Sequence, residues 1–470
     1  MGRRRDKNKI LENITLTDAG AKGKAVGHAE DGRVVFVTGA IPGDVIDARV
    51  TKKRKAYYEA TPVKIHSYSD KRTEAKCEHF GTCGGCKWQN MDYKYQLEFK
   101  QNEVVNNLTR IGHIELPEVT PISGSKEQYF YRNKMEFSFS DTRWMTLEEI
   151  QGGEDIQDRN ACGFHIPGRW DKILDVKNCY LQEDPSNEIR LETKKYAEEN
   201  NYEFFNPYQQ TGFLRTMMVR TSSTGDIMVV IQFAKEDVEK REAILNHLIE
   251  KFPNITSLMY TINSKGNDSM YDLDIIAYKG EDHIFEEMEG LRFKIGPKSF
   301  YQTNSKQAYE LYKIARDFAG LKGDELVYDL YTGTGTIAQF VAKKAKKVIG
   351  VEAVPDAITD AKLNAQINGI DNTVFYAGDM KDVFNDEFIK ENGRPDIIIT
   401  DPPRDGMHKN VVKKILEISA PKIVYVSCNS ATQARDLAMM DEMYKVTKIQ
   451  PVDMFPQTHH VENVVLLEKR

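Results

Sequence analysis

The stretch Leu326-Val-Tyr-Asp-Leu-Tyr-Thr-Gly-Thr-Gly-Thr336 decides the fold of the C-terminal part of the chain. An apolar run ends in a turn with two closely spaced glycines, Gly333 and Gly335, and helical sequence follows. Glycines at such a turn let the backbone approach a ligand closely and let a helix begin there. The stretch therefore predicts a strand, a nucleotide-binding turn and a helix, which together open a doubly wound α/β sheet.

Further strand-like runs follow this unit and alternate with helical sequence. They are Lys347-Val-Ile-Gly-Val-Glu352, Asp396-Ile-Ile-Ile-Thr-Asp401 and Ile423-Val-Tyr-Val-Ser427. Apolar strands that alternate with helices form parallel sheets, whose ligand sites lie at the carboxyl ends of the strands. We therefore predict a Rossmann-like α/β domain over residues 289–470, with its site at that edge of the sheet.

The earlier parts of the chain have other patterns. Residues 7–66 contain short β-rich runs separated by glycine-rich turns, which predicts a small OB-like β-barrel. Residues 67–288 contain β-rich and helical runs without strict alternation, which predicts an α+β central domain. The sequence does not place the polar loop at 141–162 within this domain. The chain is thus predicted to be a multidomain protein.

Composition sets the broad class of the protein. The chain has 470 residues and 40% hydrophobic content, which fits two or three domains with packed cores. No run approaches the roughly 18 apolar residues that a membrane helix needs, and no apolar segment follows the basic N-terminus. We therefore expect a cytoplasmic protein that makes no membrane contact.

The charge is unevenly distributed along the chain. The net charge is −6, yet residues 1–72 hold 16 Lys and Arg against 9 Asp and Glu, with clusters at Arg3–Arg5 and Lys52–Lys55. This surplus predicts phosphate contact by the N-terminal module. A solvated tail and a charged hairpin explain it equally well, so the charge alone does not decide.

Two motifs predict the cofactor. Glu352 closes the second strand 17 residues after Gly335, where a carboxylate can accept hydrogen bonds from ribose hydroxyls. This pair suits a dinucleotide or S-adenosylmethionine, and Ala338 in place of the third glycine of the dinucleotide fingerprint favours S-adenosylmethionine. Asp401-Pro-Pro-Arg404 predicts a rigid loop of the kind that holds a flat base beside the cofactor in methyltransferases. The alternative is a simple rigid connection.

Cys428 and Glu462 are the candidates for chemistry. Cys428 ends an apolar run between the polar Ser427 and Asn429, and Glu462 lies 34 residues later. Carbon 5 of uracil is a poor nucleophile, but a thiolate added at carbon 6 makes it reactive, and a base must then remove the carbon 5 proton. Cys428 is therefore the candidate nucleophile and Glu462 the candidate general base. A buried core thiol and a surface carboxylate are the alternatives.

A group of cysteines predicts a metal centre. Cys77-x5-Cys83-x2-Cys86 supplies three thiolates, and Cys162 or Cys179 could supply a fourth. Four thiolates serve zinc or an iron–sulfur cluster, and the x5 spacing is wider than that of a typical zinc pair, which favours iron–sulfur. Disulfides do not suit a cytoplasmic chain.

Together these motifs resemble the RNA uracil-5-methyltransferases that carry an iron–sulfur cluster, and the resemblance covers nearly the whole chain. It implies that the N-terminal barrel is an RNA-binding TRAM domain and that the segment 93–120 packs on the catalytic domain. It also implies that Cys428 is the nucleophile and Glu462 the base. The implied ligands of a 4Fe-4S cluster are Cys77, Cys83, Cys86 and Cys179. The implied contacts to S-adenosylmethionine are Gln302, Tyr331, Glu352, Asp379 and Asp401.

The TRAM domain and the four cysteines further resemble the ribosomal RNA branch of this family more than its shorter tRNA enzymes. The resemblance therefore implies methylation of carbon 5 of a specific uridine in 23S ribosomal RNA of the large subunit, through a covalent Cys–uracil adduct. The main alternative is the same chemistry on a tRNA uridine. Two other readings are an exocyclic-amine methyltransferase, which needs no thiol, and a non-catalytic RNA-binding assembly factor. No obligate protein partner is implied.

Overall fold

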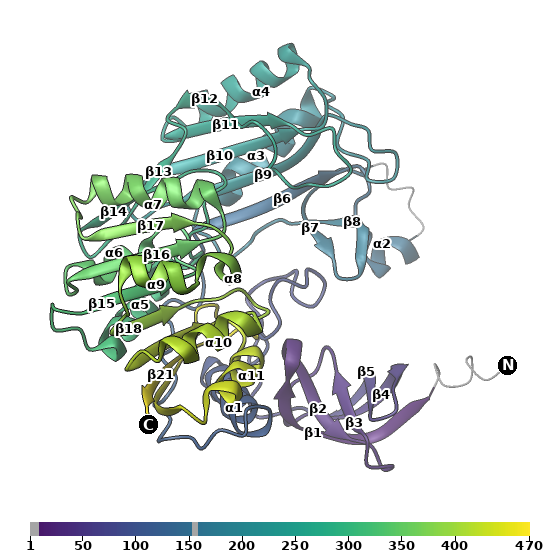
Figure 1. Cartoon of the computed structure of the whole chain (residues 1–470). Helices are drawn as coiled ribbons and strands as arrows, with labels where there is room; N and C mark the ends of the chain where they lie inside the picture. The colour runs from purple at the N-terminus through teal and green to yellow at the C-terminus, as the bar shows by residue number, and fades with distance from the viewer. Residues whose placement is uncertain (1–8, 153–157) are drawn as a thin grey trace.

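The computed structural model describes residues 9–152 and 158–470. The chain forms an N-terminal barrel, a central sheet and a C-terminal sheet, drawn in purple, blue to teal, and green to yellow in Figure 1. The predicted basic cluster Arg3–Arg5, the first two residues of the predicted barrel and residues 153–157 of the unplaced loop lie outside the described residues. Within the described ranges, no helix is both long and apolar enough to span a membrane.

Five strands close the N-terminal barrel, in the order β1-β2-β3-β5-β4. The strands are β1 (Ile10–Gly20), β2 (Lys24–His28), β3 (Val34–Val37), β4 (Val45–Lys53) and β5 (Tyr57–Ser67). Alternate residues point inward and form the barrel's own core, which includes Leu16, Val35 and Ile46. A short 3-10 turn, η2 (Ala21–Gly23), joins β1 to β2. The predicted barrel is confirmed, and the basic residues Lys52–Lys55 are exposed at the β4–β5 end.

The central domain is built on a seven-stranded mixed sheet, in the order β12-β11-β10-β9-β6-β7-β8. The strands are β6 (Lys134–Ser140), β7 (Ala161–Ile166), β8 (Arg169–Asp175), β9 (Leu214–Thr221), β10 (Ile227–Phe233), β11 (Ser257–Ile262) and β12 (Ile276–Gly280). The helices are α2 (Leu147–Gln151), α3 (Ser186–Glu199) and α4 (Val238–Lys251). Apolar side chains of α3 and α4 share one core with this sheet, so these helices cover one of its faces. A hairpin of β13 (Ile284–Met288) and β14 (Leu291–Ile295) then leads to the C-terminal domain.

The C-terminal sheet has the order β17-β16-β15-β18-β19-β21-β20. The strands are β15 (Leu326–Leu330), β16 (Lys347–Glu352), β17 (Thr373–Ala377), β18 (Ile397–Thr400), β19 (Lys422–Ser427), β20 (Tyr444–Val452) and β21 (Glu462–Lys469). The helices are α5 (Ser305–Ala319), α6 (Thr336–Ala342), α7 (Pro355–Ile367), α8 (Met380–Val383), α9 (Asp386–Asn392), α10 (Lys409–Ile418) and α11 (Ser430–Met440). The first five strands are parallel, and β21 is antiparallel to both β19 and β20. The order reverses at β15, which confirms the predicted doubly wound fold.

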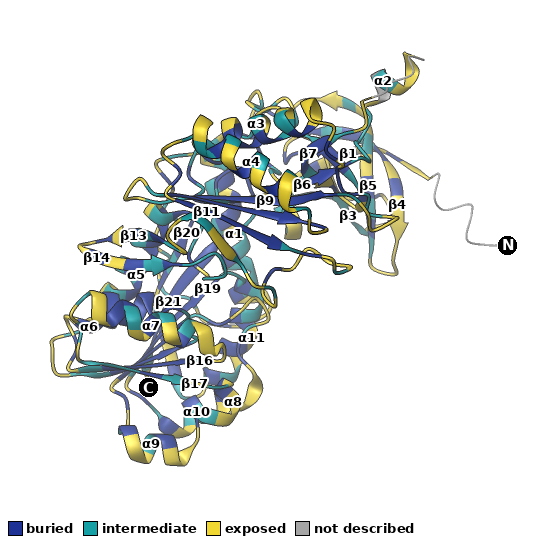
Figure 2. Cartoon of the chain, turned by 90° about the horizontal axis from the view of Figure 1, so that it is seen from above, coloured by how far each residue is buried: buried dark blue, intermediate teal, exposed yellow. Residues whose placement is uncertain are grey.

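The strands of both large sheets are mostly buried between their covering layers, as Figure 2 shows in dark blue. Helix α1 (Tyr93–Arg110) belongs to the packing of the C-terminal domain, because Val104 and Leu108 join the core beneath α10 and α11. Lys100 of this helix forms a buried 2.6 Å ion pair with Asp453. The helix thus connects the barrel side of the chain to the C-terminal sheet.

Candidate active site

The carboxyl ends of neighbouring strands bring several predicted cofactor residues together. Tyr331 follows β15 in a left-handed conformation (φ 65°), and Glu352 ends β16. The Glu352 carboxylate accepts hydrogen bonds from the backbone N–H groups of Gly333 (3.1 Å) and Val354 (3.0 Å), which fixes the glycine turn against β16. Asp379 lies just past β17 and is exposed, and the Lys381 ammonium lowers its pKa. These three side chains occupy the edge of the sheet where nucleotides bind.

Asp401 lies at the same edge, since it follows β18 and its N–H donates to the Leu330 carbonyl at the end of β15 (3.3 Å). Gln302 is partly exposed in the loop before α5, and its backbone carbonyl accepts a 2.9 Å hydrogen bond from Asn133 of the central domain. The Asn304 side chain ties this loop to the end of β20 by donating to the Met454 carbonyl (2.9 Å). The structure therefore gathers all five predicted cofactor residues from separate loops of one sheet edge.

Cys428 and Glu462 lie at the same end of two neighbouring strands. Ser427, the last residue of β19, pairs with Asn463 of β21, and Cys428 and Glu462 are the residues next to this pair on the two strands. The two side chains interact electrostatically, since Glu462 contributes to the raised pKa of Cys428. Cys428 is partly exposed, whereas Glu462 is only 5% exposed. The candidate nucleophile and the candidate base therefore share one end of the sheet.

A group of acids sets the electrostatics here: Glu462 and Asp329 are buried, and Asp401 is partly buried. Burial and then the neighbouring Asp401 raise the pKa of Glu462 to about 8, while Arg404 opposes the shift. Burial and then Asp329 raise the pKa of Asp401 to about 7. Burial, Glu462 and Asp401 together raise the pKa of Cys428 to about 12. A cationic ligand among these groups would be attracted and would lower all three pKa values.

Asp329 is a site residue that the sequence reasoning missed. It is fully buried in β15, accepts a 2.5 Å hydrogen bond from the Thr332 hydroxyl of the glycine turn, and leaves its second carboxylate oxygen without a hydrogen-bond partner. Burial raises its pKa to about 7. The signal was present in the sequence, because Asp329 is the one charged residue in the apolar run Leu326–Leu330.

The Arg404 loop is fixed against the helix that follows Cys428. The Asn429 side chain caps α11 by accepting from the Ala431 N–H, and its amide donates to the Arg404 carbonyl (2.9 Å). The Thr432 hydroxyl donates to the same carbonyl (3.1 Å). The Arg404 side chain remains exposed next to Cys428, where its charge and the N-terminus of α11 both favour a thiolate.

The barrel reaches this site through the loop before β21. A Cβ atom on Gly23 of the barrel would lie 3.1 Å from that of His459, and the Trp88 indole N–H donates to the Gly23 carbonyl (3.2 Å). Burial lowers the pKa of His459 to about 4 and that of His460 to about 3, so both rings are neutral at pH 7. The Arg132 guanidinium of the central domain lies 5.3 Å from the Phe455 ring of the same loop. All three parts of the chain therefore meet beside Glu462.

The four cysteines predicted as cluster ligands line one cavity of about 500 Å³ between the central domain and the loop 77–86. Cys162, the alternative fourth thiol, is instead fully buried in β7 among the side chains that face α3 and α4. Burial raises the pKa of Cys86 to about 12 and of Cys179 to about 11, so free thiols there stay protonated at pH 7. Among the described residues, no group of three or more His, Cys, Asp or Glu side chains is arranged to hold a metal ion.

The fold and the site define a class of protein: a doubly wound α/β domain with a nucleotide site beside a cysteine, joined to a small barrel. Residues 281–470 match the family described as tRNA (uracil-5-)-methyltransferase, and residues 12–63 match the TRAM domain. An uncharacterized RNA methyltransferase of Bacteroides thetaiotaomicron is 56% identical, over 96% of this chain and 100% of its own. Another of Porphyromonas gingivalis is 53% identical, over 97% of this chain and 99% of its own.

A solved structure extends the comparison to three dimensions. The tRNA (uracil-54, C5)-methyltransferase of Pyrococcus abyssi, in complex with S-adenosyl-L-homocysteine, is 27% identical to this chain. It superimposes with a TM-score of 0.75 over 96% of this chain and 99% of its own. The chain belongs to the S-adenosylmethionine-dependent RNA uracil-5-methyltransferases that carry a TRAM domain.

Proposed function

We propose that this enzyme methylates carbon 5 of a specific uridine in 23S ribosomal RNA through a covalent adduct with Cys428. The observation that supports the chemistry is the register of β19 and β21, whose last pair, Ser427 and Asn463, brings the neighbouring Cys428 and Glu462 to the same end of the sheet. Bound S-adenosylmethionine supplies a methyl group on a cationic sulfur. The acids Asp401 and Glu462 favour such a cation, and Gln302, Tyr331, Glu352 and Asp379 are its proposed further contacts.

In the proposed reaction, the Cys428 thiol gives its proton to water and its sulfur bonds to carbon 6 of uracil, so the electrons of the carbon 5–carbon 6 double bond form an enolate. Carbon 5 of the enolate then takes the methyl group, the bond between that methyl group and the cofactor's sulfur breaks, and S-adenosylhomocysteine is left. Glu462 removes the carbon 5 proton, the carbon 5–carbon 6 double bond re-forms, and the carbon 6–sulfur bond breaks. The thiolate leaves and regains a proton. The net change is uridine plus S-adenosylmethionine to 5-methyluridine, S-adenosylhomocysteine and a proton.

We further propose that Cys77, Cys83, Cys86 and Cys179 hold a 4Fe-4S cluster, and the cavity that these four cysteines line is the observation in its favour. Four thiols surround a cavity, which suits a group larger than a single ion, and four thiolates are a standard ligand set for this cluster. Since the methyl transfer involves no electron transfer, the cluster's proposed contribution is structural. It would hold the loop 77–86 against Cys179 of the central domain.

Two classes of RNA are candidate substrates, 23S ribosomal RNA and tRNA. The barrel together with the four cysteines supports 23S ribosomal RNA, because the resemblance implies that combination for the ribosomal branch. A tRNA uridine is favoured by another observation: the Pyrococcus abyssi enzyme, whose name specifies tRNA, covers 96% of this chain. In either RNA the target base must leave its stack to reach Cys428.

The test is to incubate anaerobically purified enzyme and S-adenosylmethionine with unmodified large-subunit ribosomal RNA or unmodified tRNA. Nuclease digestion and mass spectrometry then map 5-methyluridine. We expect methylation of one RNA that is lost in Cys428→Ala and retained in Cys162→Ala, which removes a thiol remote from the site. Methylation of tRNA alone would replace the proposed substrate, and methylation that survives in Cys428→Ala would overturn the covalent mechanism.

A further inference from the structure

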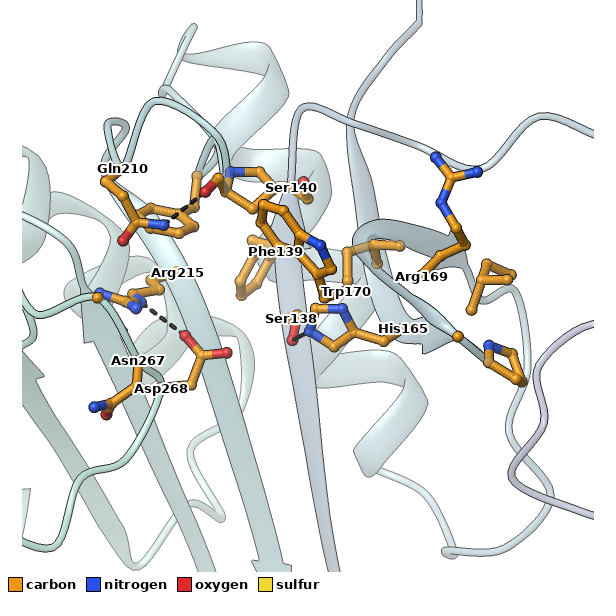
Figure 3. A pocket seen from close by; sticks show the side chains of 17 residues that line it. Ser138, Phe139, Ser140, His165, Arg169, Trp170, Gln210, Arg215, Asn267 and Asp268 are labelled. Atoms are coloured by element: carbon orange, nitrogen blue, oxygen red, sulfur yellow. Dashed lines mark hydrogen bonds and ion pairs between the residues drawn. The ribbon is translucent and has the colours of Figure 1, made fainter.

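A second cavity of about 710 Å³ lies in the central domain, on the side of the sheet opposite α3 and α4. In Figure 3, His165 and Trp170 from the β7–β8 hairpin face Gln210, Arg215 and Asp268, and Arg169 of the same hairpin also lines the cavity. The cavity contains none of the residues proposed for catalysis or for cofactor and cluster binding. Its size falls in the range of small-ligand sites.

Two exposed aromatic rings stand at this cavity. Trp170 is 62% exposed and Tyr208 is 59% exposed, and their ring centroids are 5.1 Å apart in an edge-to-face pair. Trp170 lines the cavity, and Tyr208 follows Pro207, which also lines it. Aromatic rings of this size usually bury most of their surface in the folded protein. Two neighbouring rings that both remain exposed therefore indicate a binding surface.

Hydrogen bonds hold the Tyr208 ring in place, and Trp170 packs against it. The carboxylate of Asp171, itself only 3% exposed, accepts hydrogen bonds from the Tyr208 hydroxyl and from the Arg169 guanidinium (2.9 Å). The Asn206 side chain accepts from the Tyr208 N–H (3.0 Å) and so fixes the loop that carries this ring. The Tyr208 half of the aromatic surface is therefore preorganised, which lowers the entropic penalty of binding a flat ligand.

The charges in the cavity argue against a phosphate ligand. Arg169 is paired with Asp171, and the buried Arg215 is paired with Asp268 (2.9 Å). Neutral hydrogen-bonding groups remain along the wall, among them the Ser138 hydroxyl beside the His165 ring (3.5 Å) and the Asn267 side chain. Aromatic rings beside neutral donors and acceptors match the faces and edges of a nucleobase.

The cavity adjoins the four-cysteine cavity, because His165 and Pro167 line both. Arg132 also lines the four-cysteine cavity, and its guanidinium lies 5.3 Å from the ring of Phe455 in the loop before Glu462. The cavity is therefore linked through neighbouring residues to the loop that carries the candidate base.

We propose that the Trp170–Tyr208 cavity binds an unpaired base of the substrate RNA, outside the reacting uridine, by stacking. This proposal rests on the proposed function for the identity of the polymer. Stacking there would hold the RNA segment next to the reacting uridine. It would also select RNAs that have an unpaired nucleotide at the correct distance from that uridine.

The test measures binding apart from methylation. Fluorescence anisotropy with fluorescein-labelled 12-nucleotide single-stranded RNAs and a matched duplex compares the full-length enzyme with Trp170→Ala, Trp170→Phe and Leu191→Ala. Leu191 is 39% exposed on α3, on the other side of the sheet, and serves as the control. We expect Trp170→Ala to weaken single-strand binding about tenfold, with Trp170→Phe and Leu191→Ala close to wild type. Binding of S-adenosylmethionine checks that each variant is folded.

The salt dependence of RNA binding distinguishes stacking on a base from contact with a phosphate. Since the cavity's arginines are paired, the slope of log Kd against log salt should be the same in Trp170→Ala and wild type. Unchanged affinity in Trp170→Ala, or a loss that comes with a shallower slope, would overturn the proposal. Absence of 5-methyluridine from every RNA tested with wild-type enzyme would instead overturn the proposed function and leave this binding result intact.

Discussion

At the scale of single residues, the site depends on acids kept in a nonpolar setting. Glu462 must be a carboxylate to accept the carbon 5 proton, yet its pKa is raised to about 8 and that of its neighbour Asp401 to about 7. Raised carboxyl pKa values mean that these groups bind protons more tightly in the folded enzyme than in the unfolded chain. They therefore favour folding most at low pH, and that contribution is lost as the pH rises from about 4 to about 8.

This arrangement predicts a pH dependence of activity. We expect kcat/KM for S-adenosylmethionine to rise between pH 6 and 9 with a midpoint between about 7 and 8, because the free enzyme must lose these protons. Asp401→Asn removes the repulsion that helps to raise the Glu462 pKa, so the midpoint should move to lower pH even if the rate falls. A flat profile, or a midpoint that Asp401→Asn leaves in place, would argue against Glu462 as the base.

At the scale of elements, two turns are packed together around the cysteine cavity. Gly84 has φ 76°, and a Cβ atom there would collide with Pro167 in the turn of the β7–β8 hairpin. The loop between Cys83 and Cys86 and the hairpin that carries Trp170 therefore fix each other's position. Any group held by the cysteines would stabilise both.

We accordingly predict that Gly84→Ala reduces the iron and acid-labile sulfide bound per chain by at least about half, relative to wild type. Gly81→Ala is the matched control, since Gly81 has a similar φ of 88° but no atom within 4 Å of the added methyl group. Both variants carry the backbone strain of about 1 kcal/mol, and only Gly84→Ala adds the collision. Equal iron content in the two variants would show that this contact does not shape the site.

The sequence predicted those features of the fold and the site that depend on local sequence patterns. The glycine turn after β15 and the carboxylate ending β16 have fixed spacings, so Glu352 could be placed from the sequence. The proximity of Cys428 to Glu462 could not, because it depends on β21 entering the sheet antiparallel next to β19. The Trp170–Tyr208 pair was also not predicted, since these residues are 38 positions apart and meet only in the fold, where the Tyr208 hydroxyl donates to Asp171 of the hairpin.

At the scale of the whole molecule, one contact joins the barrel to the loop that carries the candidate base. Gly23 in the barrel has φ 70°, and a Cβ atom added to it would lie 3.1 Å from the Cβ of His459 and 3.3 Å from the Cβ of Lys87. The N–H groups of Lys87 and Trp88 both donate to the Gln457 carbonyl, at 2.8 and 3.1 Å. The barrel, the segment before α1 and the loop before β21 therefore share one contact near the active site.

This contact predicts that the barrel must be correctly seated for RNA methylation. Gly23→Ala inserts a methyl group into the interface, and we expect it to lower kcat/KM for RNA about fivefold to tenfold while the Kd for S-adenosylmethionine stays unchanged. Gly32→Ala is the control, because Gly32 lies in the same barrel with φ 80° and has no atom within 4 Å of the new methyl group. The backbone strain is common to both variants, so it lowers Tm in each. If kcat/KM for RNA falls only in Gly23→Ala, the contact between the barrel and His459 is needed for methylation. Equal kcat/KM values in the two variants would mean that the barrel binds RNA without a fixed position relative to Cys428.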